Sequence, residues 1–191
     1  ARLEIYERQT GTSLSKGWIY DGQSLPGLHK IAEYCAKAIP LASQQHIQVM
    51  HGDFCFSNIF YDFRADMIRV VDPRGYVEDE RPTIFGDIRY DIAKLYHSAI
   101  GEYDTIISGG YVLEGECSND LVLKLPQTAS LLERQAVFRQ GVFGKIGITE
   151  AAAEPISVLL FLSMLPLHQD RPDRQRAFLA NGLRLFKEFY T

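Results

Sequence analysis

The chain has 191 residues, of which 46% are hydrophobic and 23% are charged, a balance typical of one soluble globular domain rather than of a disordered or collagen-like chain. Twenty basic and 24 acidic residues give a net charge of -4, and there is no block of lysine and arginine. This excludes the usual electrostatic footprint for nucleic acid or an anionic membrane, so we expect a small molecule or another protein as the partner.

The first 50 residues lead into a polar motif that begins at His51. Residues 1–25 combine a short segment of helix or strand with a Gly/Ser/Asp-rich stretch that we assign to a loop. Apolar residues then recur at helical spacing from Leu28 to Ile39, which predicts an amphipathic helix before Pro40. Because the chain begins with Ala1 and not with methionine, we expect it to be a piece of a longer protein.

A β hairpin is predicted directly after the motif, because two short β-rich runs, IFYDF and MIRVV, are separated by RAD. Asn58 and Asp72 are equally distant from Ala65, at the two ends of this hairpin. Opposed residues in an antiparallel ladder lie about 4.5 to 5.5 Å apart at Cα. We therefore expect the amide and the carboxylate to face the same small volume.

The rest of the chain is predicted to be mainly helical. A charged loop, YVEDERPTIFG, leads into a helix at DIRYDIAKLYHSAIGEY with Asp87 as its candidate N-cap. A strand is expected at LVLKL, and helices over about 129–142, 151–166 and 173–189. The apolar stretch at 156–167 is too short to span a bilayer, so we expect no membrane insertion.

The cysteines do not form a metal or redox motif. Cys35, Cys55 and Cys117 are widely spaced and include no CxxC pair, which indicates reduced thiols in a cytoplasmic protein and no zinc site.

Three oxygen-bearing side chains, Asp53, Asn58 and Asp72, lie in and around the predicted hairpin. Hard oxygen donors suit Mg²⁺, which with few protein ligands generally accompanies a phosphate substrate. A loop carboxylate five residues before an amide, then a hairpin and a second carboxylate, is the order of kinase catalytic machinery. In that machinery the first carboxylate orients and deprotonates the attacking hydroxyl, and the other two groups hold the metal.

Three ordered segments resemble the aminoglycoside phosphotransferase and choline kinase superfamily. HGDFCFSN resembles its H-G-D-x-x-x-x-N catalytic loop, VVDPRG its metal-binding segment and GDIRYDIAKL the helix that follows. The resemblance is strong over about residues 45–100. It implies that Asp53 is the catalytic base, that Asn58 and Asp72 bind Mg²⁺, and that His51 and Asp91 support the loop. HGDFCFSNIFYDFR and GDIRYDIAKLYHS also resemble bacterial capsule or lipopolysaccharide biosynthesis phosphotransferases of this superfamily.

The resemblance implies an α+β, mostly α fold: a protein-kinase-like C-terminal lobe with a small β hairpin at the catalytic site. Residues 1–191 would form this single lobe, with a lead-in at 1–50, a catalytic core at 51–100 and a mainly helical acceptor side at 101–191. The cofactors would be Mg²⁺ and ATP, and the acceptor a hydroxyl of a sugar, a choline-like amino alcohol or a related metabolite. No G-x-G-x-x-G occurs, so we expect the N-terminal nucleotide-clamping lobe to be absent.

The remaining candidates have two interpretations each. Arg74 either faces a phosphate or pairs with Glu78 or Asp79, and we favour the pairing. His168 and Asp170 either form a wall of the acceptor pocket or cap a helix.

Two alternatives to a kinase remain open. One is a catalytically idle kinase-like lobe used for interaction or regulation. The other is a metal-dependent hydrolase, which would need further His or carboxylate ligands.

Overall fold

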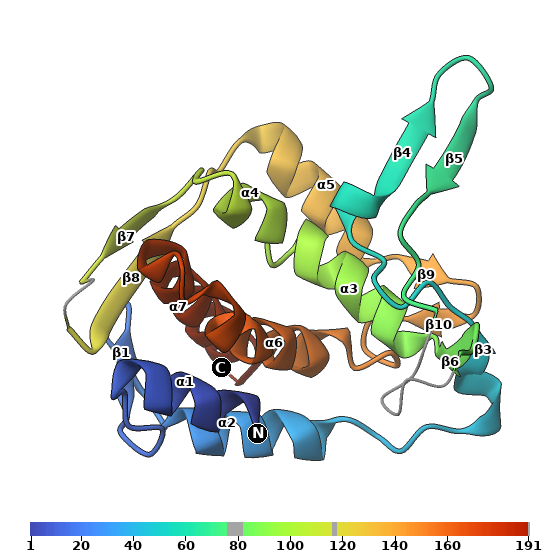
Figure 1. Cartoon of the computed structure of the whole chain (residues 1–191). Coiled ribbons are helices and arrows are strands. Elements are labelled where there is room, and N and C mark those ends of the chain that lie inside the picture. Colours follow the sequence, from blue (N-terminus) through green and yellow to red (C-terminus); the bar gives the residue numbers. More distant parts are fainter. Residues whose placement is uncertain (76–81, 116–117, 191) are drawn as a thin grey trace.

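The computed structural model describes residues 1–75, 82–115 and 118–190. Over these residues the chain is an α+β fold with seven α-helices and several small sheets (Figure 1). The predicted α+β class is therefore confirmed. Within the described ranges, no helix has both the length and the apolar character needed to cross a bilayer.

The core is built around two C-terminal helices. Helix α6 (Ala153–Met164) packs on α7 (Pro172–Tyr190), and both α3 (Arg89–Ala99) and α2 (Leu28–Ala38) pack on α6. Since neighbours cover it on several sides, α6 is apolar around most of its circumference. The other helices are α1 (Arg2–Thr10), α4 (Tyr103–Ile107) and α5 (Ala129–Arg139).

The helix predicted before the motif is confirmed. Helix α2 buries Leu28, Ile31 and Cys35 on one side, as its apolar spacing predicts. The cysteines Cys35 and Cys55 are both free and buried, and Cys117 lies outside the described residues.

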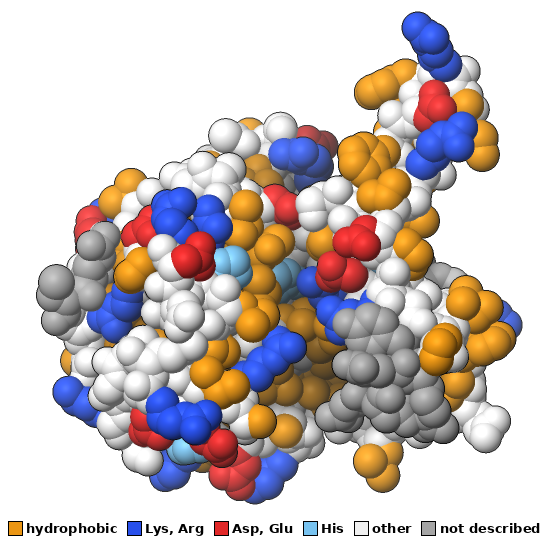
Figure 2. Space-filling model, viewed as in Figure 1, with side chains coloured by type: hydrophobic (Ala, Val, Ile, Leu, Met, Phe, Trp, Pro, Cys, Tyr) orange, Lys and Arg blue, Asp and Glu red, His pale blue; other side chains and the backbone are white. Residues whose placement is uncertain are grey.

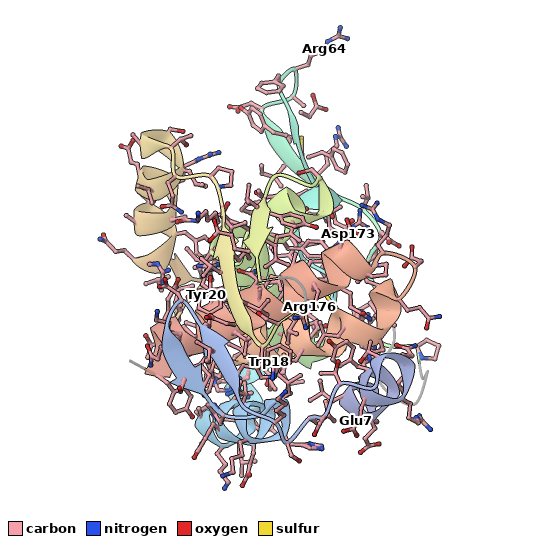
Figure 3. All side chains as sticks on the ribbon, turned by 90° about the vertical axis from the view of Figure 1, so that its left-hand side faces the viewer. Glu7, Trp18, Tyr20, Arg64, Asp173 and Arg176 are labelled. Carbon is pink, nitrogen blue, oxygen red and sulfur yellow. The ribbon has the colours of Figure 1, made fainter. Side chains whose placement is uncertain are left out.

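The loop predicted around Trp18 is wrong, because this segment forms two strands. Strand β1 (Trp18–Tyr20) pairs with β2 (Gln23–Leu25) and, in parallel, with β8 (Asp120–Lys124), whose other neighbour is β7 (Val112–Glu114). The aspartate-glycine turn between β1 and β2 has positive φ at both residues, which favours a tight hairpin. Trp18 lies beside Arg176 of α7 (Figure 3), and the guanidinium of Arg176 is 5.2 Å from the Trp18 ring. The Tyr20 ring is 5.8 Å from Nζ of Lys187, also on α7.

Three two-stranded ribbons complete the fold. Strands β4 (Ile59–Asp62) and β5 (Met67–Val70) form the predicted hairpin, which projects from the helical body (Figure 1). Strand β3 (Ile47–Val49) pairs with β6 (Phe85–Asp87), and β9 (Val142–Phe143) pairs with β10 (Ile146–Gly147). These last two ribbons are absent from the sequence prediction. Short 3-10 helices cover Gln44–His46, Phe56–Asn58 and Leu165–His168.

Helix α3 starts slightly later than predicted. Asp87 is the last residue of β6, and the N-cap position is taken by Ile88. The Asp87 carboxylate nevertheless accepts a hydrogen bond from the backbone N–H of Arg89 at 3.1 Å, so it still satisfies a donor of the first turn.

Helix α3 carries a fully buried histidine, His97, whose ring lies in the core. The ring of His97 is 4.1 Å from that of Phe161 in α6 and 4.8 Å from that of Tyr103 in α4, measured between centroids. Neither ring nitrogen has a hydrogen-bond partner among the residues that the structure describes. Burial holds the pKa of His97 well below its usual value, and the nearby charge of Lys94 acts in the same direction.

We expect the free energy of unfolding to fall as the pH drops below about 6.5, the ordinary pKa of histidine. The unfolded chain then binds a proton at His97 that the folded chain does not bind, and the loss approaches about 1.4 kcal/mol per pH unit. Urea denaturation from pH 5 to pH 8 measures it. The His97→Phe variant should lose this part of the pH dependence, whereas a change at the exposed His29, His29→Gln, should retain it. A His97→Phe variant with the parental pH profile would contradict the assignment.

Candidate functional site

The motif loop, residues 51–58, is held in place by one buried carboxylate from α3. Asp91 is 5% exposed and accepts hydrogen bonds from the backbone N–H of His51 at 2.6 Å and of Gly52 at 2.8 Å. Both oxygens are used, one for each amide. This is the contact expected of a residue that supports the loop.

Only glycine fits at residue 52, because of both its backbone conformation and the space around it. Its φ is +80°, and a Cβ atom there would lie 2.8 Å from Cβ of Arg74. The backbone N–H of Arg74 donates to the carbonyl oxygen of His51 at 2.8 Å, which fixes this close approach. The segment after the hairpin is thus held against the motif loop by backbone contacts, and any side chain at residue 52 would separate them.

His51 joins the loop to the end of the hairpin. Its Nε2 lies 2.9 Å from the carbonyl oxygen of Val71, and its Nδ1 lies 3.3 Å from the backbone N–H of Asp53. Together these contacts fit a neutral ring that donates from Nε2 and accepts at Nδ1. The His51 ring therefore connects the loop that carries Asp53 with the end of the hairpin, next to Asp72.

Asp53 lies between two polar side chains. One carboxylate oxygen is 2.7 Å from Nζ of Lys94, and the backbone carbonyl of Asp53 accepts a 2.9 Å hydrogen bond from the side-chain amide of Asn58. Lys94 is a site residue that the sequence reasoning missed. The signal that could have found it is its spacing, because it follows Asp91 by three residues and so lies on the same face of the helix.

The hairpin register differs from the prediction by one residue. Ile59 is paired with Val70, and the backbone N–H of Val71 donates to the carbonyl of Asn58 at 3.1 Å. Asn58 is therefore opposite Val71, and the expected direct opposition of Asn58 and Asp72 is wrong. Asp72 comes immediately afterwards with a φ of +57°, so the chain turns at this residue. The cause is the loop at the hairpin tip, which has four residues, 63–66. Symmetry about Ala65 would require a loop with an odd number of residues.

Asn58 and Asp72, the two candidate metal ligands, have side-chain oxygen atoms available to bind a metal ion. The Asn58 amide nitrogen is turned toward Asp53, and neither its Oδ1 nor the exposed carboxylate of Asp72 accepts a hydrogen bond from the residues that the structure describes. Within those residues, no three His, Cys, Asp or Glu side chains converge on one point. The donor set fits Mg²⁺, which keeps several waters or phosphate oxygens and needs only one or two protein carboxylates or amides.

A cavity of about 760 Å³ adjoins the motif loop. His51, Gly52, Arg74, Thr83 and Tyr90 are among its lining residues. The guanidinium of Arg74 forms no ion pair within the described part of the chain, and the favoured partners Glu78 and Asp79 lie outside it. Arg74 is thus placed where it can contact a ligand next to the loop.

His168 is the last residue of the 3-10 helix Leu165–His168, and Asp170 lies between that helix and α7. Neither residue lines the cavity beside the motif loop. The His168 ring is 4.8 Å from that of Phe178, which stacks at 5.7 Å on Tyr103. Since Nζ of Lys94 is 6.0 Å from the Tyr103 ring, this aromatic row links His168 to the Asp53 pair.

The hairpin carries apolar side chains on both faces. Its exposed residues include Phe60, Tyr61, Ile68 and Val70, and Figure 2 shows hydrophobic and basic side chains along the projecting arm. Arg64 stands at the tip (Figure 3). At its base, a second cavity of about 660 Å³ is lined mainly by apolar residues of β3, β5, β9 and α3 and of the segments beside them. An isolated hairpin of this kind is marginally stable in water, so both faces are suited to contact another group.

Comparison of the chain with protein-family models, with curated proteins and with solved structures finds no match in any of the three.

Proposed function

We propose that the chain is the C-terminal lobe of a Mg²⁺-dependent small-molecule kinase, which transfers the γ-phosphoryl group of ATP to a hydroxyl of a sugar, an amino alcohol or a related metabolite. The observation that carries the proposal is the arrangement of the motif loop. One carboxylate, Asp91, holds two consecutive backbone amides, and one amide, Asn58, holds Asp53 at the mouth of the hairpin. This leaves a carboxylate and two unused oxygen donors close to one another in the chain and in the fold.

Asp53 would accept the proton of the attacking hydroxyl. The hydroxyl oxygen then forms a bond to the γ-phosphorus, the bond from that phosphorus to the β,γ-bridging oxygen breaks, and ADP leaves. The oxygens of Asn58 and Asp72 would hold Mg²⁺, which neutralises charge on the phosphates when it is bound. The chain's own contribution is to orient the acceptor and to keep Asp53 in place, because positioning and electrostatics supply most of the catalysis in phosphoryl transfer.

One face of the β4–β5 hairpin would contact the base of a bound nucleotide. Phe60 and Val71 are exposed and, by strand alternation, share the face on which Asn58 lies. A phosphate chain that reaches Asn58 from this direction would place an aromatic base over Phe60 and Val71, beside Arg69 and its partner Asp62 on the same face. Before His51, the described residues offer no lysine on a strand: Lys16 precedes β1, and Lys30 and Lys37 lie on α2. We propose that an upstream N-terminal lobe supplies that lysine and covers the nucleotide.

Transfer is tested with MgATP and a panel of sugars, amino alcohols and other small hydroxyl compounds. The natural full-length protein is incubated with each compound, and new phosphate esters are detected by ³¹P NMR together with release of ADP. An ester that forms only with Mg²⁺ supports the proposal. ADP release without any ester across a broad panel would indicate hydrolysis and contradict it.

MgATP should bind these 191 residues at least tenfold more weakly than a version extended upstream. The proposed metal ligands and the hairpin face that would contact the base belong to this chain, but the lysine that binds the nucleotide phosphates is expected in the other lobe. Calorimetric titration of MgATP into both proteins measures the difference, with ATP in EDTA as the control for metal-dependent binding. Micromolar affinity of the 191-residue chain would mean that residues 1–50 contain a nucleotide clamp.

A catalytically idle lobe is the second candidate, and one observation favours it. An ion pair with Lys94 already occupies one oxygen of Asp53, which reduces its availability as a base. The same transfer assay separates the two candidates. An idle lobe would bind MgATP or a partner without forming an ester.

A further inference from the structure

Lys94 is buried in a way that needs explanation. It is 8% exposed on α3, and lysine is almost never this deeply buried unless it is paired. Its partner is Asp53, at 2.7 Å. An apolar residue of similar length would fill the same space without the desolvation of a charge, and such replacements of buried ion pairs are often neutral or stabilising.

Asp91 and Lys94 of helix α3 both bind the motif loop. Asp91 binds the backbone at His51 and Gly52, and Lys94, three residues later, binds the side chain of Asp53. The side chains of residues three apart lie on the same face of a helix, so α3 acts as a rigid mount for both contacts. The first contact sets where the loop lies, and the second sets where the carboxylate of Asp53 points.

We propose that Lys94 is a positioning residue, which holds the carboxylate of Asp53 in the orientation needed to receive the acceptor hydroxyl. This inference rests on the proposed phosphoryl transfer. One Asp53 oxygen is bound by Nζ of Lys94, and the other, which has only a long 3.5 Å contact with the side-chain amide of Asn58, can receive the hydroxyl. Without the lysine, only that long contact limits rotation of the carboxylate about its side-chain bonds. A displacement of about 1 Å at a reacting group can cost about 10²-fold in rate.

The test compares Lys94→Met, which keeps length but removes charge, with Lys94→Arg, which keeps the charge. Lys124→Met is the matched control, because Lys124 pairs with Glu114 on the exposed surface of β8.

In the full-length enzyme with MgATP and the acceptor found in the panel, Lys94→Met should lower kcat by about 10²-fold with little change in KM, by the same displacement argument. Lys94→Arg should recover part of the loss, and Lys124→Met should match the parent. In the Asp53→Asn background, Lys94→Met should have little further effect, since the two residues act as a unit.

A purely structural lysine would give another pattern. Lys94→Met would then change stability but leave kcat unchanged, or its effect would multiply with that of Asp53→Asn, and either result overturns the proposal. A side-chain rotamer measurement on the 191-residue chain, from three-bond NMR couplings of Asp53, requires no activity. The couplings should show one rotamer in the parent and in Lys94→Arg, and averaging in Lys94→Met. If the parental enzyme transfers no phosphate, the kinase proposal fails, and unchanged Asp53 couplings in Lys94→Met would overturn the positioning role separately.

Discussion

On the proposed phosphoryl transfer, replacing Asp53 by asparagine is expected to lower the transfer rate by about 10²-fold or more, the usual scale for loss of a general base. Asparagine has the same shape and retains an oxygen that can accept from Lys94, but it cannot take up the proton of the acceptor hydroxyl. Steady-state transfer to the acceptor measures the effect.

Folding of the Asp53→Asn variant should be affected much less than its activity. The ion pair between Asp53 and Lys94 becomes a hydrogen bond to a neutral amide, so some stability is lost, and thermal melts record how much. Asp173→Asn is the control, because Asp173 pairs with Arg171 on the exposed start of α7. Near-normal turnover in the Asp53→Asn variant would remove the proposed base, and with it the main support for a kinase mechanism.

Truncation of Asp91 to alanine is expected to lower the free energy of unfolding by about 3 kcal/mol, because two backbone amides lose their acceptor at once. Asp91→Asn should fall between the parent and the alanine variant, since an amide keeps one acceptor oxygen but turns an N–H₂ toward a donor. Urea denaturation followed by fluorescence of the single tryptophan, Trp18, measures both.

Asp120→Ala provides the comparison for the Asp91 series, because the side chain of Asp120 is exposed at the start of β8. It should unfold at nearly the parental urea concentration. Asp91→Ala as stable as Asp120→Ala would show that water replaces the carboxylate at no cost, and the loop would then not depend on α3 for its position. This test concerns the fold alone and holds whether or not the chain is a kinase.

Local sequence patterns were sufficient for the elements whose contacts are close in the chain. The apolar spacing in α2 predicted its buried side, and the two β-rich runs around Ala65 predicted the projecting hairpin. The aspartate-glycine turn after Tyr20 is also a local signal for a hairpin, and it outweighs the Gly/Ser/Asp-rich composition that predicts a loop there. Periodicity and turn chemistry act over a few residues, and this is why such elements can be predicted from sequence alone.

Contacts between distant segments could not be predicted in this way. Strand β1 pairs with β8 and strand β3 with β6. The run LVLKL predicted β8 as a strand but not its partner, and β1, β3 and β6, with three residues each, are too short to identify on their own. The hairpin register depended on the size of the loop at its tip, which the symmetry about Ala65 set wrong by one residue.

For the candidate site, the sequence by itself determined the residue types and their order: Asp53, Asn58, Asp72 and, further on, Asp91. Only the tertiary structure decided how they are held, with Asp91 on the loop backbone and Lys94 on the carboxylate of Asp53. The physical reason is that an ion pair or a buried hydrogen bond depends on atoms within about 3 Å of each other. Residues 40 positions apart come that close only after α6 and α7 have fixed where α3 lies.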